Sequence, residues 1–159
     1  MYRVVTFLCL MVMGCAAPSF AVVDVSSLAP LKEWVGVFSF EAKDGKSFWT
    51  DPLLQKEAHK ALDQAHFDGL FDNLAKQVTA PLEQRGDILF AFACKEHACN
   101  SDNARLYIDL KKNTVSVCWH SDALPSDLWF ASDKKPQEIG QGSCEKAKDF
   151  ELYGLYEKE

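Results

Sequence analysis

Two cysteines and a histidine fall within six residues of this chain, in the segment Cys94-Lys95-Glu96-His97-Ala98-Cys99. If the cysteines pair, the bridge closes a small ring that holds His97 out into solvent. Restricting the unfolded chain with so short a ring is worth only about 2 kcal/mol. A stiff loop also loses little conformational freedom on binding. We therefore expect the ring to act in recognition, as a projecting polar tip that inserts into a cleft of another molecule.

Other chemistry for these residues is less well supported. The spacing of four residues between Cys94 and Cys99 differs from the two-residue spacing of thiol oxidoreductases. A zinc set can be written from Cys94, His97, Cys99, Cys118 and His120, but thiolate ligation needs reduced cysteines, and the spacing matches no standard zinc module. A Gly-rich phosphate loop and a Gly-x-Ser-x-Gly elbow are both missing from the sequence. The sequence therefore predicts no enzyme, no metal site and no cofactor.

Histidines and acids elsewhere in the chain form no catalytic constellation. We expect His59 and His66 on the surface of helices, and we assign no specific role to His120, which follows Trp119 at a strand end. The acidic residues of the helical region are expected to cap helices or to lie on their solvated faces: Asp51, Glu57, Asp68 and Asp72.

The first residues have the pattern of an export signal. Arg3 precedes an apolar run over residues 4–13, which is too short to span a bilayer. Ser19-Phe20-Ala21 offers small residues to a signal peptidase, so residues 1–21 are predicted as a signal peptide cleaved after Ala21. The alternative is a lipobox ending at Cys15, which would become a lipidated N-terminus. Both predict export from a bacterial-type cytoplasm, to the periplasm in the first case and to a membrane anchor in the second.

Export gives meaning to the remaining cysteines. Cys94, Cys99, Cys118 and Cys144 stay in the mature chain, and four cysteines allow three pairings. The pairing Cys94–Cys99 with Cys118–Cys144 is favoured because its first bridge is local. Reduced, buried thiols are the alternative.

Composition indicates one acidic domain. Residues 22–159 would form a mature chain of 138 residues, enough to bury one core. Without Arg3 it has 23 acidic residues against 16 basic ones, a net charge of about −7. Such a surface disfavours nucleic acids and anionic membranes and favours basic partners. The sequence contains no second hydrophobic span, and it leaves a homodimer open.

The first half is predicted to be mainly helical. Residues 34–40 alternate like a strand, and Asp44-Gly45 indicates a hairpin turn to residues 47–49. Thr50-Asp51-Pro52 then resembles a helix start. Apolar residues keep helical spacing from there to Pro81, as two helices or as one helix bent at Gly69.

The second half is predicted to be β-structure. Residues 88–93 are apolar on both faces, as in a strand covered on both sides, and residues 106–110, 115–119, 128–131 and 150–156 follow as further strands. Cys118 points away from the face that its alternate neighbours share. The expected fold class is α+β: an antiparallel sheet of about five strands with a helical segment on one face and the disulfide-closed loop protruding between two strands.

The segment from Ala93 to Cys99, followed by two strands with a short turn, resembles the inhibitor of vertebrate lysozyme (Ivy-type) family. The family signature is Cys-Lys-Pro-His-Asp-Cys in a similar strand–loop–strand setting. Lys95 and His97 match it, whereas Glu96 stands in place of the proline and Ala98 in place of the aspartate. The resemblance implies an antiparallel sheet with helix on one side.

The resemblance also implies a function. In that family the disulfide-closed loop plugs the active-site cleft of c-type lysozyme, and its histidine bonds to the two catalytic carboxylates. The first hypothesis is therefore an exported lysozyme inhibitor whose binding loop is Lys95, Glu96, His97 and Ala98. The second hypothesis is a non-catalytic envelope module, anchored by lipid at Cys15 or free, that binds another cell-wall or envelope component.

Overall fold

The structure is a computed structural model, and it describes residues 27–131, 135–146 and 149–156. The predicted signal peptide, residues 1–21 with Cys15, lies outside these residues. Among the described residues, no helix has the length and apolar character needed to cross a membrane.

The described residues contain one seven-stranded antiparallel sheet, in the order β1-β3-β4-β5-β6-β7 with β2 also paired to β3. The α+β class is therefore confirmed, with more strands than the five expected. The strands are β1 Val78–Thr79, β2 Glu83–Arg85, β3 Ile88–Cys94, β4 Asp102–Asp109, β5 Thr114–Ser121, β6 Leu128–Ala131 and β7 Gln137–Glu138.

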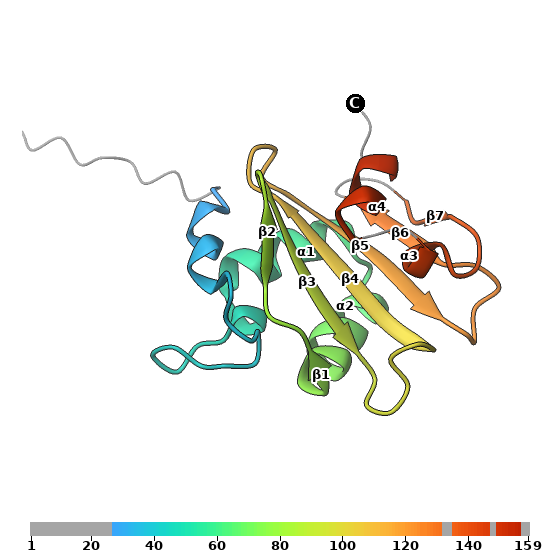
Figure 1. Cartoon of the computed structure of the whole chain (residues 1–159), viewed down its shortest axis with the longest axis horizontal. Helices are drawn as coiled ribbons and strands as arrows, with labels where there is room; N and C mark the ends of the chain where they lie inside the picture. The colour runs from blue at the N-terminus through green and yellow to red at the C-terminus, as the bar shows by residue number, and fades with distance from the viewer. Residues whose placement is uncertain (1–26, 132–134, 147–148, 157–159) are drawn as a thin grey trace, which may run out of the picture.

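Both faces of the sheet are covered, as the apolar character of residues 88–93 predicted. On the helix face, Leu106 packs in one core with residues of the helices. On the aromatic face, Tyr107 and Cys118 pack in a second core with the C-terminal segment. Figure 1 shows the first helices behind the sheet and the last two in front of it. Cys118 thus points away from Val117, as expected from the period of a strand.

Two helices cover the helix face, α1 Pro52–Ala61 and α2 Gln64–Asp68. Asp51 caps α1 by accepting a hydrogen bond of 2.8 Å from the backbone N–H of Leu53, so the predicted start is confirmed. The α2 segment continues as a π-helical turn over Gly69–Asn73 and a 3-10 turn over Leu74–Lys76. Of the two alternatives, the structure therefore has two helices, divided at Leu62 and Asp63, and the second helix changes type at Gly69.

The strand predicted over residues 34–40 is wrong. A 3-10 helix occupies Ala29–Trp34, and the residues after it form only isolated bridges to Pro81 and Leu82. Leu31 and Trp34 are three residues apart, so one 3-10 face carries both into the core. The turn at Asp44-Gly45 is present, but a second 3-10 helix, Phe48–Thr50, replaces the expected second arm of the hairpin.

The last predicted strand is also wrong. Residues 150–156 lie in α4 Asp149–Tyr156, which follows the short helix α3 Ser143–Lys146. Leu152 and Tyr153 are buried against the aromatic face, and the Tyr153 hydroxyl donates a 2.8 Å hydrogen bond to Asp109 Oδ2. A short apolar run fits either a strand or a helix, and here the contacts with the sheet favour the helix.

Candidate functional site

A disulfide closes the loop between β3 and β4, at the lower end of the sheet in Figure 1. Cys94 is the last residue of β3 and is fully buried, with 4.8 Å between its Cα and that of Cys99. The second bridge, Cys118–Cys144, joins β5 to α3 on the aromatic face. The structure therefore contains both bridges of the favoured pairing, and the small ring stands on a buried base.

The tip of this loop is a tight turn. The backbone N–H of Ala98 donates a hydrogen bond of 3.0 Å to the carbonyl of Lys95, which leaves Glu96 and His97 as the central residues. Glu96 has a negative φ and His97 a φ of 61°. This combination defines a type II turn. Histidine is among the non-glycine residues enriched at positive φ, so the backbone tolerates His97 at this position.

The side chains at the tip face solvent. The His97 side chain is 91% exposed and its Nε2 lies 3.6 Å from Glu96 Oε1, an ion pair that solvent weakens. Lys95 is also exposed, and its Nζ lies 3.9 Å from Asp102 Oδ2. The imidazole is thus open to solvent and is not used in packing within the chain.

Backbone hydrogen bonds brace the loop from both sides. The Glu96 N–H donates to Gln77 Oε1 at 2.9 Å, from the segment just before β1. The Lys95 N–H donates to the Asp102 carbonyl at 3.0 Å, and the Asp102 N–H donates to the Ala98 carbonyl at 2.9 Å. Gln77 was not identified from the sequence because its partner is 19 residues away.

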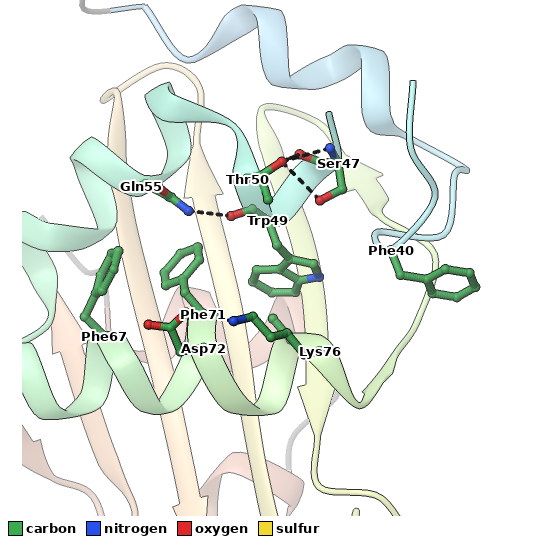
Figure 2. Close-up of a pocket in the computed structure, with 10 residues that line it drawn as sticks. Phe40, Ser47, Trp49, Thr50, Gln55, Phe67, Phe71, Asp72 and Lys76 are labelled. Carbon is green, nitrogen blue, oxygen red and sulfur yellow. Dashed lines mark hydrogen bonds and ion pairs between the residues drawn. The ribbon is translucent and has the colours of Figure 1, made fainter. Parts of the chain in front are cut away.

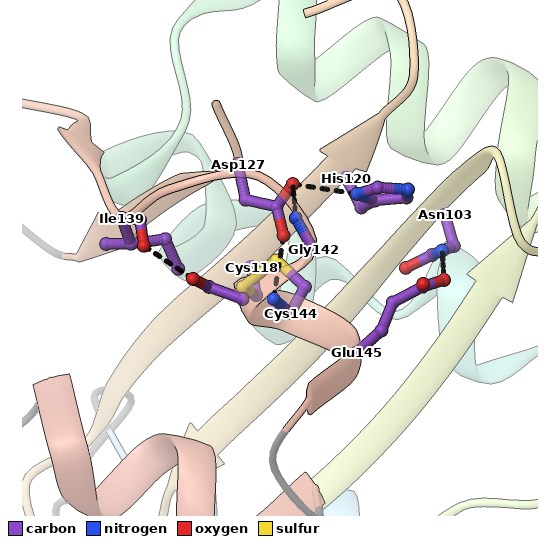
Figure 3. The surroundings of a disulfide bond; sticks show 9 residues. Asn103, Cys118, His120, Asp127, Ile139, Gly142, Cys144 and Glu145 are labelled. Atoms are coloured by element: carbon purple, nitrogen blue, oxygen red, sulfur yellow. Dashed lines mark hydrogen bonds and ion pairs between the residues drawn. A yellow bond between two sulfur atoms is a disulfide. The ribbon is translucent and has the colours of Figure 1, made fainter. Parts of the chain in front are cut away.

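A buried ion pair joins His120 to Asp127, as Figure 3 shows. His120 Nδ1 is 2.7 Å from Asp127 Oδ1, and His120 Nε2 is 3.0 Å from the Asn100 carbonyl. The two side chains are 3% and 0% exposed. Asp127 Oδ2 also accepts a 2.7 Å hydrogen bond from the backbone N–H of Cys144.

The environment of His120 favours its charged form. Burial is the largest single influence and by itself would lower the pKa of His120. The hydrogen bond and charge of Asp127, the charge of Glu145 and the Asn100 carbonyl together outweigh it and raise the pKa above 6.5. His120 had no assigned role from the sequence, because none of these three partners is adjacent to it in the chain.

The remaining histidines and acids serve the helices. The ring of His59 stacks on Phe67, with 3.5 Å between centroids. His66 Nδ1 lies 2.9 Å from Asp63, which caps α2. Asp72 pairs with Lys76 one turn later. His59 is exposed, as expected, whereas His66 is half-buried against the rings of Trp119 and Phe130. Glu57 was expected on a solvated helix face, but it is buried and pairs with Lys60 at 2.7 Å.

A half-open cavity of about 540 Å³ lies on the helix side, between the segment around Trp49 and the helix that follows α2 (Figure 2). Phe67 and Phe71 supply its apolar wall, and Thr50, Gln55, Asp72 and Lys76 are among its polar lining residues. None of the tip residues 95–98 lines it. The protruding loop and this hollow are therefore separate features.

The zinc set considered from the sequence is not assembled. Within residues 27–131, 135–146 and 149–156, no group of three or more His, Cys, Asp or Glu side chains is placed to hold a metal ion. Cys94, Cys99 and Cys118 lie in disulfides, which removes the thiolates that such a site would need.

Comparison with known proteins gives one match. The family model described as inhibitor of vertebrate lysozyme (Ivy) matches residues 54–145, from α1 to α3, which includes the whole of the Cys94–Cys99 loop. No curated protein and no solved structure matches the chain.

Proposed function

The chain belongs to the inhibitor of vertebrate lysozyme family, and we propose that it inhibits c-type lysozyme by inserting the Cys94–Cys99 loop into the enzyme's active-site cleft. Proteins of this family are lysozyme inhibitors, not enzymes. The observation that carries the loop mechanism is the 91% exposed imidazole of His97 at the tip of a disulfide-closed turn.

The chemistry of the tip suits a glycosidase cleft. A retaining glycosidase holds two carboxyl groups roughly 5 Å apart. A protonated imidazole has two N–H donors, Nδ1 and Nε2, directed away from each other. His97 therefore donates one hydrogen bond to each carboxyl group, and a bond to a carboxylate is charge-assisted. Such a contact also blocks both groups that the enzyme uses.

The rigidity of the loop supports tight binding. Ordering a mobile loop costs free energy when a complex forms. Here the disulfide, the Lys95–Ala98 turn and the hydrogen bond from Glu96 to Gln77 hold the loop before any partner arrives. Most of the ordering cost is therefore already met in the folded inhibitor.

Charge supports rapid association. The whole chain has a formal net charge of −6, and lysozymes of this class are typically basic proteins. Opposite net charges steer two proteins together and raise the association rate. Glu96, exposed beside His97, then meets a basic residue at the rim of the cleft.

The proposed setting follows from family and disulfides. Family membership and two disulfides indicate an exported protein. We place the mature chain, residues 22–159, in the periplasm as one lysozyme-inhibitor-like domain after cleavage behind Ala21. There it protects the cell wall from a muramidase.

The test is lysis of a peptidoglycan suspension by c-type lysozyme. The protein should slow lysis, and His97→Asn should weaken inhibition on the order of a hundredfold, because two hydrogen bonds to charged groups are lost. Asparagine is the informative change because it also tolerates a positive φ, so the turn is kept. His97→Ala should lose at least as much.

The matched control is His59→Asn on α1, an exposed histidine outside the loop, which should leave inhibition unchanged. Equal inhibition by the protein and by His97→Asn would move the contact surface away from His97. Absence of inhibition by the unaltered protein would favour the second hypothesis, an envelope module.

A further inference from the structure

The base of the loop is held by a side chain that cannot touch a partner. Asn100 follows Cys99 directly, and its carbonyl lies 3.0 Å from His120 Nε2. The opposite ring nitrogen, Nδ1, lies 2.7 Å from Asp127 Oδ1. A carbonyl and a carboxylate are both acceptors, so both hydrogen bonds form only when both ring nitrogens carry a proton.

The carboxylate that balances this charge is fixed in place. Asp127 is completely buried and accepts from the backbone N–H groups of Cys144 at 2.7 Å and Gly142 at 3.2 Å. Cys144 is in turn bonded to Cys118, two residues before His120 in β5. The imidazole is therefore positioned by a rigid part of the aromatic face. A buried cation needs such a paired and hydrogen-bonded partner.

Acidic groups approach His120 from several of the surrounding elements. Asp127 precedes β6, and Asp122 follows β5, with its Oδ1 3.5 Å from His120 Nε2. Glu145 contributes its charge from α3. The one basic residue of β4, Arg105, lies on the same face opposite Cys118, with its guanidinium 5.9 Å from the centroid of the Phe92 ring. Asp127 and Glu145 both raise the pKa of His120 and so favour the imidazolium form.

This pair does not act as a catalytic dyad. An Asp–His pair in a hydrolase directs the free ring nitrogen at a nucleophile. Here Nε2 is occupied by the Asn100 carbonyl, and the His120 side chain is 3% exposed. The arrangement holds backbone in place.

We propose that His120 is a positioning residue for the binding loop: as an imidazolium paired with Asp127, it fixes the Asn100 carbonyl and thereby the base of the Cys94–Cys99 ring, and the loop loosens when His120 loses a proton. The effect on inhibition rests on the proposed function. The effect on the loop itself does not.

The first experiment follows the free protein by NMR, in the chain from residue 22 onward with His97→Asn. That substitution removes the imidazole of the loop, so a titration of the amides of Asn100 and Ser101 reports His120. We expect the His120 ring to carry both protons at pH 6 and the two amides to shift with the midpoint of His120, above pH 6.5. The proposal is overturned if the His120 ring carries only one proton at pH 6, or if the chemical shifts of the two amides do not change as His120 titrates.

The second experiment measures inhibition of c-type lysozyme by the unaltered protein and by His120→Gln at pH 6 and pH 9. The ratio of the two inhibition constants at each pH cancels every effect of pH that the two inhibitors share. We expect His120→Gln to be about tenfold weaker at pH 6, as for loss of one charge-assisted hydrogen bond, with the difference closing by pH 9. A ratio that does not change with pH contradicts the proposal.

The control is His59→Gln, the same substitution at an exposed histidine of α1, which should leave the inhibition constant unchanged at both pH values. If the unaltered protein does not inhibit lysozyme at either pH, the proposed function fails, while the NMR result still decides whether His120 positions the loop. The NMR experiment also keeps His120 itself, so it decides the question even if His120→Gln does not fold.

Discussion

At the scale of single residues, Glu96 occupies the position of a type II turn at which proline is favoured. The family signature has a proline there, and proline would fix φ through its ring. Glu96 keeps a backbone N–H instead, and this N–H donates to Gln77 Oε1 at 2.9 Å. A hydrogen bond from a neighbouring segment thus takes the place of a covalent restraint on the turn.

Gln77→Ala should weaken lysozyme inhibition about three- to tenfold, because the turn loses one hydrogen bond that orders it before binding. Gln77→Glu keeps an acceptor at the same place and should inhibit like the unaltered protein. The measurement is the inhibition constant at fixed pH and salt.

The same comparison should be made in a protein that already carries Glu96→Pro. Proline has no N–H for Gln77, so Gln77→Ala should have no further effect when Pro replaces Glu96. An equal loss from Gln77→Ala in both backgrounds would show that Gln77 acts on binding by another route.

The sequence predicted those site residues whose relation is local. Cys94, His97 and Cys99 lie within six positions, so the ring and its exposed tip followed from spacing alone. Gln77 and His120 lie 19 and 20 residues from the backbone groups that they bind. Such contacts depend on sheet register, which a single sequence does not specify at the level of one hydrogen bond.

At the scale of elements, Gly69 sets the distance between the α2 segment and the sheet. A Cβ on Gly69 would lie 2.9 Å from the ring of Trp119 in β5, closer than side chains normally pack. The absence of a side chain lets the helix lie directly on the indole. Gly69, where the helix changes type, is therefore also a point of close packing.

Gly69→Ala should lower the free energy of unfolding by about 1–3 kcal/mol, since the new methyl group must displace the indole. Gly154→Ala in α4 is the matched control, because nothing lies within 4 Å of a Cβ built there. That change should raise the free energy of unfolding by about 0.5–1 kcal/mol through helix propensity. Urea unfolding measures both, and the same sign for the two variants would contradict the packing argument.

The elements that the sequence misassigned are short apolar runs at the two ends of the domain. Residues 34–40 and 150–156 have too few residues to separate a period of two from a helical period. Contacts decided both: Trp34 packs with the helix-face core, and Tyr153 reaches Asp109 across the aromatic face. β3 was assigned correctly from a continuous apolar run bounded by turn residues, and β4 and β5 from their alternation.

At the scale of the whole molecule, the sheet separates two cores, and the Cys94–Cys99 loop connects two strands, β3 and β4, that contribute to both. The helix-face core and the aromatic-face core each include alternate residues of β3, β4 and β5. The apolar residues on both faces of β3 predicted that both faces of the sheet are covered. They did not predict that α4 covers the aromatic face. The hydrogen bonds that hold the loop come from two places in the fold. Gln77, at the end of the helical segment, binds the Glu96 N–H, and His120, near α3, binds the Asn100 carbonyl.

The stability of the whole domain should therefore depend on pH with opposite signs at the two ends of the range. A raised pKa, as for His120, gives stability that is fully present below the unfolded value of 6.5 and is lost as pH rises through the folded value. Asp63 behaves in the opposite way. A hydrogen bond from the backbone N–H of His66 lowers the pKa of Asp63 and outweighs the opposing effect of burial. The stability that Asp63 contributes is therefore present above pH 3.8 and is lost as pH falls through the pKa of the folded state.

Urea unfolding from pH 3 to pH 9 separates the two groups. The difference in unfolding free energy between the unaltered protein and His120→Gln should be constant up to pH 6.5 and then decrease as pH rises. The difference from Asp63→Asn should be constant above pH 4 and decrease only in acid. If the His120 difference instead stays constant to pH 9, the imidazole does not lose its proton in the folded protein below that pH, and the loop it holds would stay ordered across the whole range in which lysozyme is assayed.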